Sequence, residues 1–592
     1  MNAQSAKATW IWYPGDFEIW LSNQMQNRRT ERFAFVPPFW RVYSHNPQVN
    51  FSKQVDLPAP EEVTVAVEGK FNVTINGRYV QQPDMQRITI PAGKHDVNFQ
   101  VFNQGSPPSV YVQGKTIVSD SSWKVELVRN NSADNIPGRA KHGNAGNWNF
   151  NSMDKTPSAF RLPVKEVSAV KVSKQKNNVV VDFGQETFGF VQLKNLKGSG
   201  KVSLYYGESM EEALSADSCE TFDFFHLTNH NGDFTSDHSR ALRFVNIVPD
   251  GSISFDNVSL LYEYLPLSRR GAFRTSDEEL NKIWEVSYRT LDLNTREFFL
   301  DGIKRDRWIW SGDAVQSYLM NFYSFFDNET VKRTAWALRG ADPVEAHINT
   351  ILDYSLYWFT GTFDYYLYSG DEAFLKSIYP RMVSLMDFVL KRRNNNGMLV
   401  GLPGDWVFLD WAPMTKEGEL SAIQILFARS LEAMAVCASL MKDEKGAGMY
   451  NQLSVDLKKK IMETFWDPQQ QVFIHSRKDG QPNKQVTRYA NMFAMMFGYL
   501  DPVKTEAVKN NVLMNDKVLK ITTPYMRFYE LAALAEAGQQ AFVLKEIKDY
   551  WGGMLKEGAT SFWEVYDPAE KGVQHLAMYG RPFGRSLCHA WG

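Results

Sequence analysis

The chain has 592 residues, of which 65 are basic and 67 are acidic, so its formal net charge is −2. This length predicts about two to four domains, because single hydrophobic cores stop growing at about 250–300 residues. The balanced charge gives no reason to expect nucleic acid or an anionic membrane as a partner. The three cysteines lie far apart, and their spacing indicates neither a disulfide framework nor a metal site.

The first part of the chain, residues 1–130, has the pattern of β-structure. Apolar and polar residues alternate over residues 63–67 and 71–75, and Asn76-Gly77 then supplies a tight hairpin turn. No long helical period appears there. We therefore expect an accessory β-sandwich, for which a carbohydrate-binding role is open.

A connecting segment and a second β region follow. Residues 131–163 are rich in Asn, Ser, Gly and Pro, which predicts a linker. Strand patterns return at residues 179–184 and 189–193, separated by a turn. We expect a second β-sandwich over residues 164–270.

Helical periodicity begins at residue 276 and continues to the end of the chain. Residues 276–279, Ser-Asp-Glu-Glu, form a capping box, and Leu280, Ile283 and Trp284 then fall on one helical stripe. At roughly 26 residues for a helix with its loop, residues 271–592 would form about twelve helices. The predicted fold class is therefore multidomain β plus α, with N-terminal β-sandwich domains followed by an (α/α)6 six-hairpin barrel.

Charged and aromatic residues concentrate between Asp301 and Asp313, where the sequence is Asp-Gly-Ile-Lys-Arg-Asp-Arg-Trp-Ile-Trp-Ser-Gly-Asp. This segment holds three carboxylates, three cations and two tryptophans. Such a loop is costly to bury unless its groups pair with one another or with a polyol. A surface loop with local ion pairs is the simpler alternative.

Two further segments contain candidate site residues. Glu564 lies between Trp563 and Tyr566, and apolar surroundings tend to raise the pKa of a carboxyl group. A structural carboxylate is an equal alternative there. Gly404-Asp-Trp406 is a turn that carries a tryptophan. Two carboxylates from distant loops are the minimum equipment for glycoside hydrolysis, and the sequence contains no serine elbow, phosphate loop or zinc motif that competes.

In these segments the chain resembles the bacterial α-L-rhamnosidases of glycoside hydrolase family 78. Residues 301–313 are similar to the family motif, approximately Asp-Cys-Pro-x-Arg-(Asp)-Glu-x-x-Gly-Trp-x-Gly-Asp. Similar segments occur in the family's order at residues 181–185, 189–190, 271–277, 404–406, 523–525 and 558–564. The resemblance covers residues 165 to 592, and it implies β-sandwiches, a six-hairpin α/α barrel and an inverting mechanism.

The resemblance also implies a role for each matching residue. Asp306 falls at the position of the general acid and Glu564 at that of the general base. Asp301 and Asp313 fall where acids hold sugar hydroxyls. The full set of expected substrate-binding residues is Asp301, Arg305, Trp310, Asp313, Trp358, Trp406 and His589, and among them the tryptophans are chosen as pocket walls.

The chain departs from the family motif at two places. Asp306 stands where the family usually has Glu, in a motif one residue shorter than its longer form. The missing methylene withdraws the carboxyl by about 1.5 Å, so either the backbone advances or Asp306 is not the acid. Gly302-Ile303 replaces Cys-Pro, which leaves room for altered specificity or for lost activity.

The expected function is the inverting release of terminal α-L-rhamnose from glycosides or plant polysaccharides, with a rhamnose-containing oligo- or polysaccharide as partner and with no cofactor or metal. Another glycosidase on the same barrel, or a non-catalytic carbohydrate-binding protein, is the alternative. No apolar run reaches the roughly 18 residues that span a bilayer. We expect a periplasmic or secreted protein without its signal peptide, with a cytoplasmic location open. Family members normally continue with a further helix and a β domain, so we expect a fragment or a shortened form.

Overall fold

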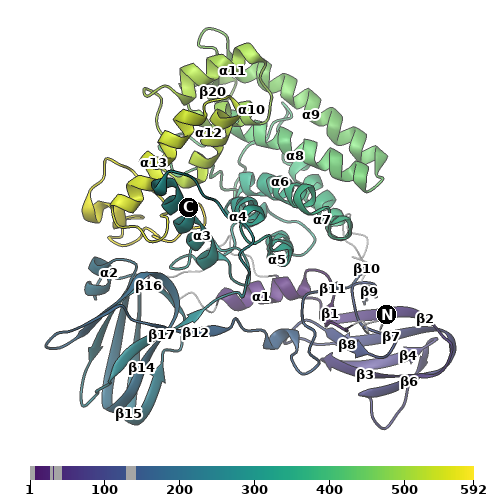
Figure 1. Ribbon diagram of the computed structural model, residues 1–592. Helices are drawn as coiled ribbons and strands as arrows, with labels where there is room; N and C mark the ends of the chain where they lie inside the picture. Colours follow the sequence, from purple (N-terminus) through teal and green to yellow (C-terminus); the bar gives the residue numbers. More distant parts are fainter. Residues whose placement is uncertain (1–6, 27–30, 33–42, 129–141) are drawn as a thin grey trace.

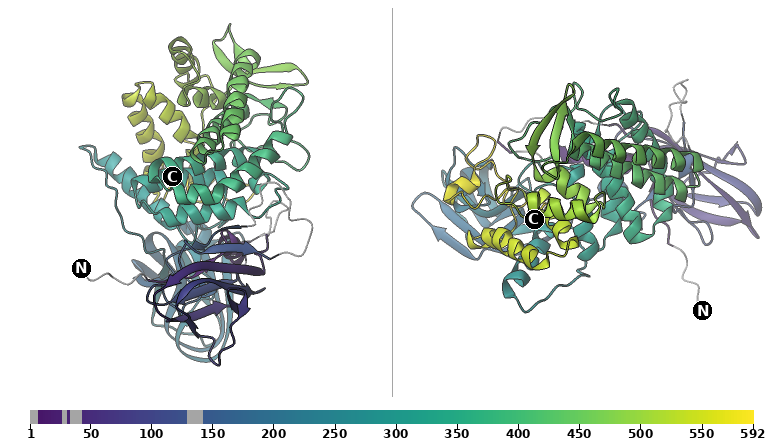
Figure 2. Two further views of the ribbon diagram at one scale, coloured as in Figure 1. Left: turned by 90° about the vertical axis from the view of Figure 1, so that its right-hand side faces the viewer. Right: turned by 90° about the horizontal axis from the view of Figure 1, so that it is seen from above.

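The computed structural model of the protein describes residues 7–26, 31–32, 43–128 and 142–592. Two β-domains lie at the base of the molecule, and a larger helical domain lies above them (Figure 1). Figure 2 agrees with this arrangement, since the strands gather on one side of the helices in its left-hand view. Helix α1 (Asp16–Gln26) lies between the two β-domains, beneath the helices.

The N-terminal domain is a sandwich of two antiparallel sheets. Its strands are β1 (Ile11–Trp12), β2 (Gln48–Leu57), β3 (Glu61–Glu68), β4 (Lys70–Ile75), β5 (Arg78–Tyr79), β6 (Arg87–Ile90), β7 (Gly93–Phe102), β8 (Ser109–Gln113), β9 (Lys124–Leu127), β10 (His142–Asn144) and β11 (Gly146–Asn147). The sheet orders are β11-β1-β8-β3-β6 and β10-β9-β2-β7-β4-β5. Alternate residues such as Val63, Val65 and Phe99 face inward and form a separate core.

Two predicted boundaries of this domain differ from the structure. Residues 142–147, expected in the linker, form the edge strands β10 and β11, because short polar segments can pair at a sheet edge without a buried face. Residues 131–141 of that linker lie outside the described residues. The start of the chain is not only β-structure either, since Trp12 and Phe17 pack into the core of the helical domain.

The second β-domain is built around one long strand. Its strands are β12 (Val164–Ser168), β13 (Lys171–Lys174), β14 (Val179–Gly207), β15 (Thr221–Thr235), β16 (Arg240–Pro249) and β17 (Asn257–Glu263). Strand β14 pairs with β16 through both of its halves and with β17 through its middle. Because β14 bends in this way, its apolar residues enclose a core, as the sequence pattern predicts. Helix α2 (Met210–Leu214) follows β14.

The helical domain consists of consecutive helical hairpins. Its α-helices are α3 (Glu278–Asn294), α4 (Ser311–Tyr323), α5 (Asn328–Arg339), α6 (Leu352–Ser369), α7 (Glu372–Lys391), α8 (Ser421–Leu440), α9 (Glu444–Phe465), α10 (Arg488–Met496), α11 (Pro502–Val508), α12 (Pro524–Glu536) and α13 (Gln540–Lys556). Residues 271–592 are all described and hold eleven α-helices, one fewer than the sequence predicts. The C-terminal segment 557–592 lies between the last and the first hairpin, where Trp591 stacks on Tyr525 of α12 and the Phe562 N–H donates to Thr290 of α3.

The inner, even-numbered helices of this barrel begin differently from the odd-numbered ones. The even-numbered helices α4 to α12 pack against one another and form the inner ring. The odd-numbered helices α3 to α11 each begin with an aspartate whose side chain accepts backbone N–H groups. For α3 this residue is Asp277, one position after the predicted Ser276. The inner helices have no side-chain cap, and two of them begin beside the pocket described below.

One helix of the described residues, α8, is long and apolar enough to cross a membrane by length and composition, although the sequence analysis found no such run. It belongs to the inner ring, and 67% of its most apolar window is buried inside the protein. A small sheet belongs to the same part of the chain. Its strand β18 (Glu419–Leu420) precedes α8, and its strands β19 (Trp466–Asp467), β20 (Val472–Lys478) and β21 (Gln481–Val486) follow α9.

Candidate active site

A cavity of about 370 Å³ lies where the N-terminal ends of α4 and α6 meet the C-terminal segment. Of the nine site residues predicted from sequence, eight line it. The lining residues are Glu31, Asp301, Arg305, Asp306, Trp310, Asp313, Ile351, Tyr354, Trp406, Phe408, Trp411, Glu564, Tyr579, Arg581, His589 and Trp591. Residues from distant parts of the chain thus meet at one cavity.

Asp301 organises the loop that carries the predicted acid. Its Oδ2 accepts the backbone N–H of Asp306 at 3.1 Å, and its Oδ1 accepts that of Trp308 at 3.1 Å. Burial and, after it, the neighbouring charge of Asp306 raise the pKa of Asp301 to about 7. Asp301 therefore fixes the backbone of Asp306, and it holds a proton at pH values where an ordinary aspartate has lost it.

Asp313 lies in the first turn of α4, at the buried floor of the pocket. The Tyr354 hydroxyl donates to its Oδ2 at 3.0 Å, and Nε2 of His589 lies 3.9 Å from its Oδ1. Burial, and then the charge of Asp301, raises the pKa of Asp313 well above its ordinary value. Burial lowers the pKa of His589 to about 4, so this imidazole is neutral near pH 7.

Glu564 has cationic and hydrogen-bonding surroundings. Arg305 forms an ion pair with its Oε2, the Tyr579 hydroxyl donates to its Oε1 at 2.8 Å, and the Ser586 N–H donates to Oε2 at 3.3 Å. Burial alone would raise the pKa of Glu564, but Arg305 and these hydrogen bonds lower it below its ordinary value. The expectation of a raised pKa is therefore wrong, because the apolar neighbours Trp563 and Tyr566 are not the groups that contact the carboxylate.

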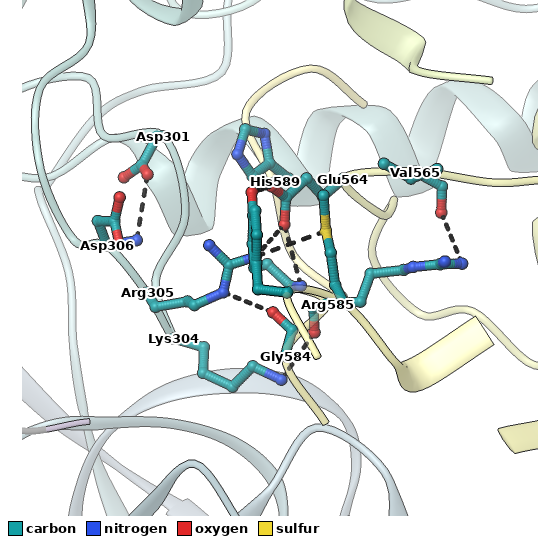
Figure 3. A network of polar contacts seen from close by, with 12 residues as sticks. Asp301, Lys304, Arg305, Asp306, Glu564, Val565, Gly584, Arg585 and His589 are labelled. Atoms are coloured by element: carbon teal, nitrogen blue, oxygen red, sulfur yellow. Dashed lines mark hydrogen bonds and ion pairs between the residues drawn. The ribbon is translucent and has the colours of Figure 1, made fainter. Parts of the chain in front are cut away.

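The two predicted catalytic carboxylates come from opposite sides of this cluster. Figure 3 shows Asp301 and Asp306 on one side of Arg305, and Glu564 and His589 on the other. Arg305 comes from the motif loop, and its side chain crosses to the C-terminal segment, where it reaches Glu564 and the carbonyl oxygen of Gly584.

Aromatic side chains form the remaining wall. A backbone bridge joins Ile351, just before α6, to Trp406 and holds that turn beside the pocket. The Trp411 ring lies 5.9 Å from that of Trp406 and 5.4 Å from that of Tyr579. Trp310, directly before α4, completes this side. Such rings suit the apolar face of a pyranose.

Trp358 is the one predicted wall residue that the structure places elsewhere. Its side chain is 1% exposed, and its indole N–H donates to the Ala335 carbonyl of α5 at 2.9 Å. Helix α6 is apolar around most of its circumference, so residue type does not reveal which of its sides faces the pocket. The first turn, with Tyr354, faces the pocket, whereas Trp358 packs between helices.

Several lining residues were missed by the sequence analysis. These are Glu31, Ile351, Tyr354, Phe408, Trp411, Tyr579, Arg581 and Trp591. Trp591 stands two positions after His589, and Trp411 follows the predicted Trp406 turn, so closeness to a predicted residue could have found both. Glu31 and Tyr579 lie outside every recognised motif and carry no such signal.

The departure at Gly302-Ile303 has a structural cause. Ile303 is fully buried and belongs to the core of the second β-domain, together with Cys588. A Cβ at residue 302 would lie 2.6 Å from the Arg305 carbonyl oxygen, so the loop is closed too tightly there for a larger residue. These two residues attach the motif loop to its neighbours, and neither lines the pocket.

The second β-domain also binds the two cations that flank the predicted acid. Lys304 lies 3.0 Å from Glu208 and 3.3 Å from Glu212, with all three side chains buried. Arg307 donates to the carbonyl oxygen of Ser239 at 3.0 Å. Because a buried charge without its partner is costly, these contacts fix the loop on both sides of the acid. Within the described parts of the chain, no group of three or more His, Cys, Asp or Glu side chains could hold a metal ion.

The pocket, its facing carboxylates and the ring of hairpins around them define a protein of the six-hairpin glycosidase class. The family model described as the bacterial α-L-rhamnosidase six-hairpin glycosidase domain matches residues 268–592, more than half of the chain. The protein therefore belongs to the bacterial α-L-rhamnosidase family. A second model, for the N-terminal part of α-rhamnosidase-like proteins of bacteroidetes, matches residues 49–247.

Two curated relatives are α-L-rhamnosidases. The one from Alteromonas sp. (strain LOR) is 23% identical over 585 residues, which cover 88% of this chain and 57% of the relative. The one from Formosa agariphila is 22% identical over 385 residues, which cover 53% of this chain and 39% of the relative. The alignments thus span less than two thirds of the length of either relative.

Solved structures share the fold. The rhamnosidase from Klebsiella oxytoca with rhamnose bound has a TM-score of 0.62 and 23% identity, over 71% of this chain and 87% of that chain. The rhamnosidase of glycoside hydrolase family 78 from Bacillus sp. GL1 has a TM-score of 0.63 and 18% identity, over 99% of this chain and 68% of that chain. The predicted architecture of β-domains followed by a six-hairpin barrel is confirmed.

Proposed function

We propose that the chain is an inverting α-L-rhamnosidase that releases terminal rhamnose from a glycoside or polysaccharide. The observation that carries the proposal is that Asp306 and Glu564, from distant parts of the chain, line one cavity. Glu564 is paired with Arg305, and Asp306 stands beside the carboxyl group of Asp301. Glycoside hydrolysis by inversion needs this combination of a carboxylate base and a carboxylic acid.

In the proposed reaction Asp306 protonates the glycosidic oxygen, and Glu564 removes a proton from the attacking water. Arg305 keeps Glu564 ionised, so that the base is ready at neutral pH. Asp301 holds the backbone of the acid, and burial raises its own pKa to about 7. Asp313 and His589 on the floor supply groups for sugar hydroxyls.

Rhamnose is the proposed sugar because the family is that of α-L-rhamnosidases and because one fold relative has rhamnose bound. The aromatic wall of Trp406 and Trp411 fits the apolar side of a deoxysugar, including its methyl group.

The test is a panel of aryl glycosides with NMR of the first product. We expect hydrolysis of aryl α-L-rhamnoside and first release of the β-anomer of rhamnose. Release of the α-anomer would contradict inversion. Hydrolysis of a different glycoside would change the sugar, and binding of rhamnose without any turnover would favour a non-catalytic carbohydrate-binding protein.

A further inference from the structure

We propose that Glu31 and Arg581 form a polar subsite at the mouth of the pocket that binds the hydroxyl groups of a sugar leaving group. The proposal rests on the proposed function, because it concerns the part of the substrate beyond the scissile bond. Its chemical consequence is a preference for rhamnose attached to another sugar over rhamnose attached to an apolar aromatic aglycone.

The depth of the pocket decides where a leaving group lies. Its floor is closed by side chains that are at most 5% exposed, which are Asp301, Asp313, Tyr354, His589 and Trp591. Tyr579 on the same wall is 45% exposed, and Arg581 is partly exposed. A terminal sugar fills the closed end, so the remainder of the substrate leaves past Tyr579 and Arg581.

Glu31 reaches this pocket from outside the barrel. The Arg32 guanidinium donates to the carbonyl oxygens of Ala216 and Cys219, both at 2.9 Å, and its planar group stacks on the Phe222 ring. These contacts attach residues 31–32 to the second β-domain. The N-terminal part of the chain therefore supplies a buried carboxylate to a pocket that belongs to the barrel.

Arg581 is fixed by the same neighbours. Its Nη1 donates to Glu220 at 2.6 Å and to the Arg32 carbonyl oxygen at 3.4 Å. The backbone N–H of Arg32 in turn donates to the carbonyl oxygen of Glu220. Glu31 and Arg581 thus line the same cavity and are attached to the same neighbours, which lowers the entropic cost of binding.

The chemistry of this pair suits a polyol. A carboxylate accepts hydrogen bonds from hydroxyl groups, and a guanidinium donates to their lone pairs, so adjacent hydroxyls of a sugar satisfy both. A flat apolar aglycone has few such groups and would form few of these hydrogen bonds. The pair therefore discriminates by the leaving group and contributes nothing to the terminal rhamnose.

The experiment compares two substrates in Glu31→Gln, with Glu62→Gln, an exposed acid of strand β3, as the matched control. We expect kcat/KM for a rhamnosyl disaccharide to fall roughly 10-fold or more, because a hydrogen bond to a charged group is lost. Aryl α-L-rhamnoside should change less than about 2-fold. Equal losses on both substrates, or no loss on the disaccharide, would overturn the proposal.

Binding measurements separate this proposal from the proposed function. In the Glu564→Gln background we expect calorimetry to give tighter binding of the disaccharide than of free rhamnose, with the difference removed by Glu31→Gln. This result would support the subsite even if the chain hydrolysed neither substrate. A disaccharide that binds no more tightly than rhamnose would overturn it, even if the chain proved to be a rhamnosidase.

Discussion

The motif loop and the C-terminal segment meet across one pocket, and they give their carboxylates opposite surroundings. On the C-terminal side Glu564 is paired with Arg305 and accepts hydrogen bonds from Tyr579 and Ser586, so its pKa is lowered. On the motif side the acidic residues stand beside one another, and burial followed by Asp306 raises the pKa of Asp301 to about 7.

The difference lies in where the Arg305 side chain points. Arg305 belongs to the motif loop by sequence, but its side chain crosses to the other wall and neutralises Glu564. Lys304 and Arg307, the other two cations of the loop, are bound by the second β-domain. The three cations of the loop thus connect it to the C-terminal segment and to the second β-domain.

The largest expected effect comes from the base. Glu564→Gln keeps the shape of the side chain but removes the negative charge that accepts the proton of water. We expect turnover of aryl α-L-rhamnoside to fall by about 10²–10⁴-fold, the scale of general acid–base catalysis. Steady-state kinetics would measure this loss, and circular dichroism would check that the fold is intact. Near-normal turnover would remove Glu564 from this role.

The acid should show a different pattern. Asp306→Asn removes the proton donor, which matters most when the leaving group is a poor one. We expect a loss of about 10²-fold or more on rhamnosyl glycosides of sugars and a much smaller loss on nitrophenyl rhamnoside. Equal losses on both substrates would contradict the assignment of Asp306 and would erase the contrast between the two walls.

The sequence predicts the acidic members of this site together with Arg305 and His589, but not which acid each of these two contacts. Asp301, Asp306 and Asp313 lie within one loop and the helix that follows it, so a single motif brings them together at the pocket. The path of Arg305 to Glu564 is not visible in the sequence, because it depends on how residues 557–592 fold back across the barrel.

The boundaries of the domains illustrate the same limit. The β-pattern of residues 63–75 and the helical period after residue 276 are properties of local sequence, and both are found in the structure. Phe17 lies in a segment that reads as part of a β-domain, but it packs into the core of the barrel. Such long-range packing leaves no periodic signal, which is why Glu31 was also missed.

The pH profile tests the acidic pair. Asp301 has a raised pKa, so its proton is present below about pH 7 and is lost as the pH rises through that value. We expect kcat/KM to fall about 10-fold for each pH unit above this point. Asp301→Asn removes the group with the pKa of about 7, so its profile should no longer show a limb at that pH even if its maximal rate is lower. A wild-type profile that stays flat to pH 9 would contradict the proposal.

The smallest effect concerns the two tryptophans that were predicted together. Trp406 lines the pocket, whereas Trp358 packs between α5 and α6 and donates to Ala335. Trp406→Phe should raise KM for aryl rhamnoside several-fold, because part of the stacking surface is lost. Trp358→Phe should change KM less than about 2-fold and should instead lower the melting temperature, since it leaves a buried carbonyl unpaired and a cavity behind. A raised KM with an unchanged melting temperature in Trp358→Phe would mean that the pocket wall extends deeper along α6 than its first turn.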